Sequence, residues 1–114
     1  MRSYSHKLII VIMGNAQFSK TAASTFKVEG DFNYDTAAAL WTTSKALLAT
    51  APSPIRIDLS GITHSDSAGV ALLIAWLRSA RQQKKTIQFL HLPDQITAIL
   101  KVSGLEIIFE VYNG

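Results

Sequence analysis

The chain has 114 residues, of which 48% are hydrophobic and 17% are charged, and it has no cysteine. This length and composition indicate one globular domain, and the lack of cysteine excludes disulfide scaffolds, thiolate metal sites and cysteine nucleophiles. The net charge is +3, but residues 1–28 hold four Lys and Arg residues and no acid, and the remainder is nearly neutral. A nucleic-acid-binding domain usually spreads its basic residues over one face, so this distribution disfavours a nucleic-acid partner.

The N-terminal segment, residues 1–23, has three interpretations. Six consecutive apolar residues, 8–13, follow Arg2 and Lys7, which is the outline of a signal peptide. The run is short for that purpose, no small-residue cleavage pattern follows closely, and it is far too short to span a bilayer. We therefore prefer a buried or edge β-strand. The third alternative is that translation begins at Met13 and the residues before it are extra.

A strand and a helix are predicted next. Residues 25–29 alternate between polar and apolar side chains, which predicts a strand, and residues 31–35 are typical of a turn. Apolar side chains then recur at helical spacing over residues 37–48, which predicts a helix. Asp35 can cap the start of this helix, and Pro52 stops it because proline cannot continue a helix.

The clearest strand of the sequence comes in the middle of the chain. Residues 55–59 alternate strictly between apolar and polar side chains, and residues 61–66 are predicted to form a loop. Residues 67–83 follow as a helix, because the segment is long and rich in good helix formers. The Lys and Arg residues near its end favour the negative pole of the helix dipole.

The last third of the chain repeats the pattern. Residues 86–90 predict a strand. A third helix is expected from Pro93, with Gly104 as its C-terminal cap, and residues 107–112 predict a last short strand or turn.

The order of elements defines the fold class. Strand and helix alternate three times, which is typical of an α/β fold with parallel strands joined by right-handed crossovers. Parallel strands that are covered on both faces read as continuous apolar runs, whereas these strands alternate. We therefore expect the helices to lie mainly on one face of the sheet and the other face to be relatively open.

The sequence shows no catalytic motif. Nucleophile elbows, HExxH sites, Walker loops and glycine-rich dinucleotide loops are absent. His64, Asp66 and Ser67 suggest a triad, but neighbours on one loop seldom make the required chain of side-chain contacts. His64 and Asp66 also lack an evident third metal ligand. We therefore expect neither a hydrolase nor a metal or other cofactor at these residues.

The segment from Asp58 to Gly69 is the most distinctive part of the chain. It joins a strand to a helix and places the hydroxyl of Ser67 at the helix N-terminus, where backbone N–H groups and the dipole stabilise an added phosphate. Small residues at the start of this helix would let a partner approach closely. The residues by themselves favour a structural role, in which Asp66 or Ser65 caps the helix.

The same segment, Asp58-Leu-Ser-Gly-Ile-Thr-His-Ser-Asp-Ser-Ala-Gly69, resembles the signature of the STAS domain family. The resemblance runs from about Ser24 to Val111 and includes residues 29–32, 92–95 and 102–105. The family includes anti-sigma factor antagonists, cytoplasmic tails of sulfate transporters and a subunit of Mla-type lipid-asymmetry ABC transporters. The resemblance implies a single non-enzymatic interaction domain over residues 1–114, with a mixed, mainly parallel sheet and helices mainly on one face.

The resemblance also implies roles for individual residues. Ser67 aligns with the serine or threonine that a partner kinase phosphorylates in the antagonists, and with the position that contacts the ATPase in the Mla-type subunit. Asp66 aligns with the adjoining acid. Trp41 and Trp76 look more like the Mla-type subunit, although core packing explains both tryptophans equally well.

The leading expectation is therefore a cytoplasmic accessory subunit of an Mla-type phospholipid transporter. It would bind and stabilise or regulate the ATPase, and would associate with the inner membrane through that partner. The alternative is an anti-sigma factor antagonist that binds an anti-sigma factor kinase and is switched by phosphorylation of Ser67. A lipid-binding or small-molecule module on the open sheet face is a third, weaker reading. The expected partner-contact residues are Thr63, His64, Ser65, Asp66 and Ser67.

Overall fold

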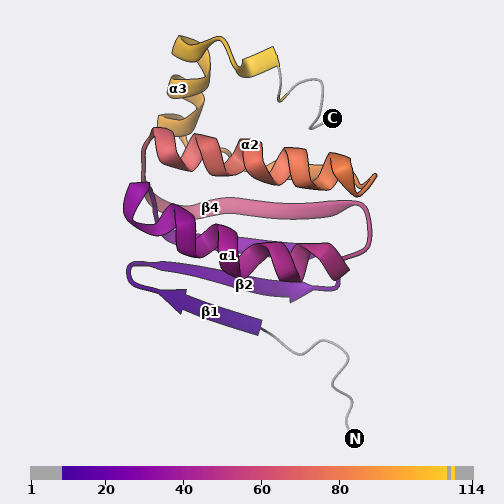
Figure 1. Cartoon of the computed structure of the whole chain (residues 1–114). Coiled ribbons are helices and arrows are strands. Elements are labelled where there is room, and N and C mark those ends of the chain that lie inside the picture. Colours follow the sequence, from indigo (N-terminus) through magenta and orange to yellow (C-terminus); the bar gives the residue numbers. More distant parts are fainter. Residues whose placement is uncertain (1–8, 108, 110–114) are drawn as a thin grey trace, which may run out of the picture.

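The computed structural model describes residues 9–107 and residue 109, and it has an α/β fold. One five-stranded sheet has the strand order β1-β2-β3-β4-β5, and α1 and α2 lie side by side against the same face of it (Figure 1). The elements are β1 (Ile9–Met13), β2 (Ala16–Ala22), β3 (Thr25–Phe32), α1 (Tyr34–Thr50), β4 (Ile55–Ser65), α2 (Ser67–Gln82), β5 (Ile87–Leu90) and α3 (Asp94–Ser103). None of the helices among these residues is long and apolar enough to cross a membrane.

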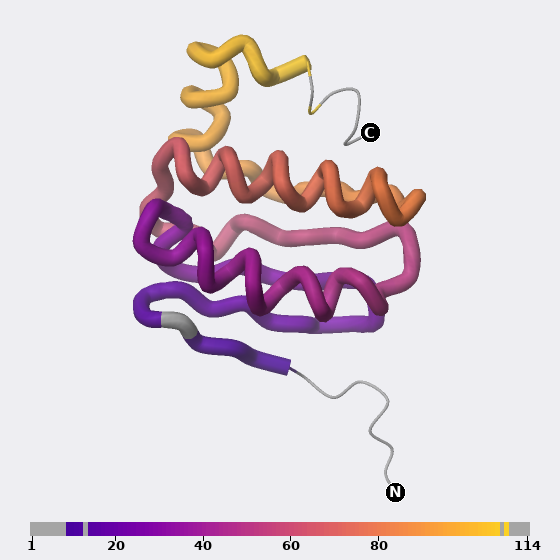
Figure 2. Tube along the Cα trace, in the orientation of Figure 1, coloured from indigo at the N-terminus to yellow at the C-terminus, as the bar shows by residue number. Residues whose placement is uncertain are grey.

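The sheet is mixed, as expected for this fold. The pairs β3–β4 and β4–β5 are parallel, whereas β1–β2 and β2–β3 are antiparallel. Residues 9–13 form an edge strand, which is one of the predicted alternatives. This strand, β1, forms a hairpin with β2 at one side of the sheet (Figure 2). The sequence did not predict β2.

The prediction of a loop over residues 61–66 was wrong. β4 continues to Ser65, which lies opposite Phe32 at the end of β3. Two register irregularities between β3 and β4 break the regular pattern of side chains there. Period-two alternation therefore ends near residue 59 although the backbone pairing continues.

Two further predictions at element ends were also wrong. The cap of α1 is Asn33 and not Asp35, because the Asn33 side chain accepts a hydrogen bond from the backbone N–H of Asp35. Near the C-terminus, Ile107 and Phe109 are helical rather than in a strand or turn. Phe109 is buried, with its ring 5.9 Å from that of Phe89. Residues 108 and 110–112 lie outside the described residues.

The core is centred on Trp76. Its fully buried ring lies about 6 Å from the rings of Phe18, Phe32 and Phe89, and its indole N–H donates to the hydroxyl of Ser44 at 2.8 Å. This hydrogen bond satisfies two buried polar groups and ties α2 to α1. The packing explanation for Trp76 is thus confirmed, so this residue does not distinguish between the subfamilies.

The opposite face of the sheet is polar in its middle. Along β4, Ile57 and Leu59 are fully buried under the helices, whereas Arg56 and Ser60 are exposed. Arg56 donates from Nε to the side-chain oxygen of Gln88 on β5 across this face. The alternation in the sequence therefore indicated correctly that the helices cover one face.

Candidate functional site

The predicted contact residues lie where the parallel strands end and the helices begin. We call the segments Asp31–Asp35, Thr63–Ser67 and His91–Gln95 the site end. They join β3 to α1, β4 to α2 and β5 to α3, so the N-termini of all three helices meet there. In open α/β sheets, binding sites form preferentially at this edge.

Asp66 caps two helices at once. Its Oδ1 accepts the backbone N–H of Ala68 at 2.8 Å, which makes Asp66, one of the two predicted candidates, the N-cap of α2. Its Oδ2 accepts the backbone N–H of Tyr34 at 3.2 Å, in the first turn of α1. Both oxygens satisfy donors that a helix N-terminus otherwise leaves without partners. One carboxylate thus fixes the start of α2 relative to the start of α1.

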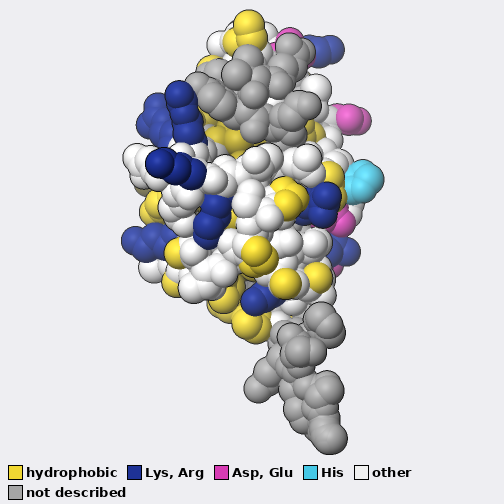
Figure 3. All heavy atoms as spheres, turned by 90° about the vertical axis from the view of Figure 1, so that its right-hand side faces the viewer, with side chains coloured by type: hydrophobic (Ala, Val, Ile, Leu, Met, Phe, Trp, Pro, Cys, Tyr) yellow, Lys and Arg dark blue, Asp and Glu magenta, His cyan; other side chains and the backbone are white. Residues whose placement is uncertain are grey.

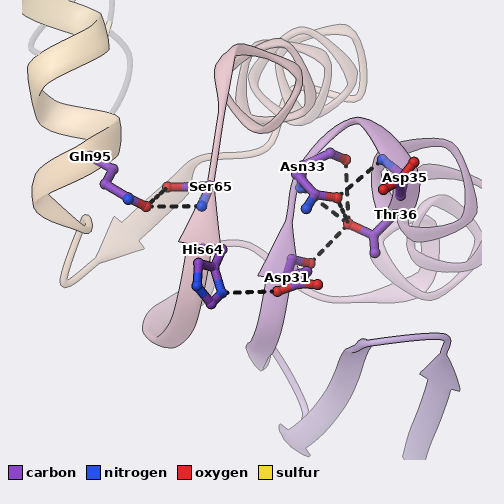
Figure 4. Close-up of polar contacts among 7 residues, drawn as sticks. All are labelled: Asp31, Asn33, Asp35, Thr36, His64, Ser65 and Gln95. Carbon is purple, nitrogen blue, oxygen red and sulfur yellow. Dashed lines mark hydrogen bonds and ion pairs between the residues drawn. The ribbon is translucent and has the colours of Figure 1, made fainter.

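Two side-chain contacts hold the end of β4 on its other sides (Figure 4). The backbone N–H and the hydroxyl of Ser65 both reach Oε1 of Gln95, at 2.9 and 3.0 Å, in the first turn of α3. The His64 Nδ1 lies 3.3 Å from an oxygen of Asp31 on β3. The segment between β4 and α2 is therefore fastened to three neighbouring elements.

The start of α1 is fixed by a capping box. Asn33 accepts the backbone N–H of Asp35 at 3.1 Å, and its own backbone N–H donates to the hydroxyl of Thr36 at 3.2 Å. The buried Thr36 hydroxyl also donates to the carbonyl oxygen of Asp31 at 2.8 Å (Figure 4). Such reciprocal capping holds the start of a helix firmly.

Gly69 packs inward and does not face a partner. A Cβ built at this position would lie 2.5 Å from the Phe32 carbonyl oxygen and 2.6 Å from its ring. The expectation that this small residue leaves room for a partner was therefore wrong. Glycine is needed because α2 begins in direct contact with the end of β3.

The five predicted residues fall into two groups. Thr63, His64 and Ser67 are exposed, and the Ser67 hydroxyl makes no hydrogen bond to any other described residue. Ser65 and Asp66 are partly buried and hold the segment in place through the bonds above. The structure thus presents Ser67 outward, in the first turn of α2.

Sequence reasoning missed Tyr34. This side chain is 82% exposed, and its backbone N–H is bonded to Asp66, the residue next to Ser67. The expected cap was Asp35, two residues after the observed cap Asn33, so Tyr34 counted as part of a turn. An aromatic residue directly before an acidic first turn was the available signal, because exposed tyrosines are common anchors in protein interfaces.

The site end carries negative charge. It contains Asp31, Asp35, Asp66 and Asp94, and no Lys or Arg. No group of three or more His, Asp or Glu side chains in the described part of the chain is placed to hold a metal ion. The charge and the exposed hydroxyl and phenol groups suit a basic, hydrogen-bonding protein surface.

Comparisons with known proteins place this geometry in a family. A family model described as "Mlab, STAS domain" matches residues 16–110. The chain is 29% identical over 59 residues to the anti-sigma-B factor antagonist of Listeria monocytogenes, covering 52% of each protein. It is 27% identical over 60 residues to that of Staphylococcus aureus, covering 53% of this chain and 56% of the relative. The chain thus spans about half the length of the curated relatives it matches.

The fold has a solved counterpart. The anti-sigma factor antagonist SpoIIAA, in its unphosphorylated form, superimposes with a TM-score of 0.59 at 13% sequence identity. The superposition covers 84% of this chain and 96% of SpoIIAA. At this level of identity the likeness concerns the fold alone.

Proposed function

The chain belongs to the STAS domain family of protein-interaction modules, and from this premise we propose that it binds the ATPase subunit of an Mla-type phospholipid transporter through its site end. In this role it works without catalysis, on the cytoplasmic side of the inner membrane, by stabilising or regulating the ATPase. The observation that carries the proposal is the outward position of Ser67 on a segment fastened to three neighbouring elements.

The site end is suited to docking because contacts within the protein already hold it in one conformation. Asp66, Ser65 and His64 fix the segment through contacts to α1, α3 and β3. Little conformational entropy is then lost on binding, which favours affinity for a given contact area. Ser67 supplies an exposed hydroxyl and Tyr34 an exposed phenol, and both residues adjoin Asp66, one in sequence and the other through its backbone N–H.

The family model supports the transporter partner. It is the Mla-type model, and it covers residues 16–110, whereas the antagonist relatives match only about half of the chain. The acidic site end adds a requirement, since the ATPase should present a basic patch where it contacts Asp31, Asp35 and Asp66.

A second candidate function rests on those same relatives. They are named anti-sigma-B factor antagonists, which supports a switch in which a partner kinase phosphorylates Ser67. The exposed hydroxyl in the first turn of α2 could accept a phosphate, and the helix dipole favours the added charge there. Asp66 opposes this charge, although two backbone N–H groups already bond its oxygens.

Affinity purification of the tagged protein from its own host, with mass spectrometry, tests the two functions. We expect an ABC-type ATPase with its permease to co-purify, and the protein to have an unmodified intact mass. The variant Ser67→Arg should lose the ATPase while remaining folded, with a melting temperature only slightly below that of the wild type. Ser103→Arg, the same exchange at an exposed position in the last turn of α3, should retain it.

The other outcomes are equally specific. A folded Ser67→Arg protein that binds the ATPase with unchanged affinity would remove the site end from the contact. Recovery of a kinase-like anti-sigma factor, with an intact mass raised by one phosphate, would replace the transporter role by the phosphorylation switch. In that case Ser67→Asp should release the kinase.

A further inference from the structure

The end of the molecule opposite the site end concentrates positive charge. The C-termini of α1 and α2 meet there with the start of β4, because the helices run antiparallel to the parallel strands. Figure 3 looks onto this end and shows Lys and Arg side chains spread over it, with Asp and Glu at the margin. We call it the basic end, and it comprises Lys45, Arg56, Arg78, Arg81, Lys84 and Lys85.

Carboxylates do not neutralise the main cations of this surface. Lys45, Arg78 and Lys84 are exposed, and none of them pairs with an Asp or Glu among the described residues. The Lys45 ammonium lies 6.0 Å from the centre of the Trp41 ring, which leaves its charge unneutralised. The surface therefore presents a positive field to the solvent.

Helix dipoles account for only part of this charge. Lys85 donates from Nζ to the carbonyl oxygens of Leu48 and Ala49, at 3.2 and 2.7 Å, and so caps the C-terminus of α1. A favourable dipole interaction is confined to the last turn of a helix. Lys45 and Arg78 lie farther from the ends of α1 and α2, so capping does not explain them.

Lys84 holds its charge at a cost in backbone energy. It has φ +58°, in the left-handed region, directly after the C-cap of α2. The bonds from Lys84 N–H to Arg81 and from Lys85 N–H to Ala80, at 3.0 and 2.8 Å, form the helix termination that normally uses glycine here. A cation in place of the favoured glycine indicates that the charge has a use.

An apolar side chain accompanies the cations at one side. Ile9 of β1 lies opposite Lys20 of β2, and Lys20 lies opposite Phe26 of β3, next to the residue that pairs with Arg56. The start of β1 is therefore at the basic end. The next residue, Ile10, is 47% exposed. Cations together with an exposed aliphatic residue are typical of surfaces that bind at the polar boundary of a lipid bilayer.

We propose that the basic end binds the surface of a membrane containing anionic phospholipids. A bilayer surface requires cations that face one way and needs no concave site, and the basic end provides such a set of cations (Figure 3). A single-stranded nucleic acid would need exposed aromatic side chains for stacking, and the exposed Tyr34 lies at the site end. This binding is separate from the proposed ATPase contact and would direct the site end away from the membrane.

Sedimentation with lipid vesicles tests the proposal. The full chain should bind vesicles of phosphatidylcholine with phosphatidylglycerol, should not bind phosphatidylcholine alone, and should dissociate as salt rises. Each exposed cation near such a surface contributes about fivefold to binding. The variant Arg78→Gln/Lys84→Gln should therefore bind about 25-fold more weakly, by the same principle.

A control with the same change in net charge separates position from charge. Lys101→Gln removes one cation outside the basic end, on α3, and should change vesicle binding less than twofold, whereas Lys84→Gln should weaken it about fivefold by the same principle. Equal losses in both variants would overturn the proposal, as would an absence of binding at low salt. Binding to single-stranded DNA but not to vesicles, sensitive to Arg78 and Lys84, would reassign the surface to nucleic acid.

The two proposals fail independently. Ser67→Arg leaves the basic end unchanged, so it should bind vesicles as the wild type does. Arg78→Gln/Lys84→Gln leaves the site end unchanged, and purified ATPase should still bind it in the absence of lipid.

Discussion

The site end and the basic end lie at opposite ends of α1 and α2 (Figure 1), yet they use polar groups in different ways. At the site end, Asp66 and Ser65 are occupied by bonds within the protein, and they hold a segment in shape. At the basic end, Lys45 and Arg78 are exposed and have no carboxylate partner within the described part of the chain. Recognition at the site end should therefore depend on geometry as well as charge, whereas recognition at the basic end should depend on charge alone and weaken more steeply with salt.

Removing the double cap should give the largest effect on stability. Asp66→Ala removes the N-cap of α2 and the acceptor for Tyr34 N–H, so two backbone donors lose their partner. We expect a loss of about 2 kcal/mol in the free energy of unfolding, measured by urea denaturation. The ATPase should also be lost, even at a temperature where the variant is folded.

Asp35→Ala is the matched control for this variant. It removes an exposed carboxylate from the first turn of α1, where no side-chain cap depends on it. Only the dipole interaction is lost, so the cost should be about 0.5 kcal/mol. If Asp66→Ala costs no more than Asp35→Ala, the double cap does not hold the site end together.

The sequence predicted the outline of the site end but not its internal bonds. The helix starting near Ser67 and the cap at Asp66 follow from local rules, because a capping side chain and its helix are neighbours in sequence. The contacts of Asp66 with Tyr34 and of Ser65 with Gln95 join residues about 30 positions apart. Such contacts depend on strand order and register, which one sequence does not specify.

The basic end was predicted only in part, as a cluster of cations at the end of one helix, for the same reason. After position 28 the acidic and basic residues nearly balance. The net positive charge of the chain was therefore assigned to the N-terminal segment. Folding separates the acids and bases of this neutral stretch onto opposite ends, because acids lie near helix starts and cations near helix ends. Net charge along the chain therefore gave no sign of the surface.

The second prediction concerns the loss of fold stability caused by the left-handed backbone of Lys84. Lys84→Gly relieves the left-handed backbone strain and should stabilise the fold by about 1 kcal/mol. It should also weaken vesicle binding about fivefold, since one cation is lost. Thermal unfolding and vesicle sedimentation on the same protein measure both effects.

Lys84→Ala separates charge from strain. It removes the same charge but keeps a Cβ, so vesicle binding should fall equally while stability does not rise. A Lys84→Gly protein that is no more stable than Lys84→Ala would mean that lysine occupies this position at no cost. The charge at position 84 would then cost the fold no stability, and Lys84 would not show that the basic end keeps its charge at the expense of stability.

The smallest effect is expected between the two ends, at Asp58 on the open face of β4. Burial by itself would raise the pKa of this carboxyl. Hydrogen bonds from the Ser60 backbone N–H, at 2.8 Å, and from the Ser60 hydroxyl act in the opposite direction, as do the charges of His91 and Lys27. Together they lower the pKa below its ordinary 3.8. Because the pKa is lower in the folded state, the ionised carboxylate stabilises the fold above pH 3.8, and this contribution is lost as the pH falls through the folded value. Asp58→Asn should therefore be less stable than wild type at pH 7 by about 0.5 kcal/mol.

That difference should shrink toward zero in acid, when urea unfolding is measured at a series of pH values. It should survive added salt, because short hydrogen bonds from Ser60 are screened far less than the separated charges of His91 and Lys27. A difference that vanishes in salt would show that long-range charge governs Asp58. The positive field of the basic end would then extend across the open face of the sheet to Asp58. The site end and the basic end would in that case not be electrostatically separate.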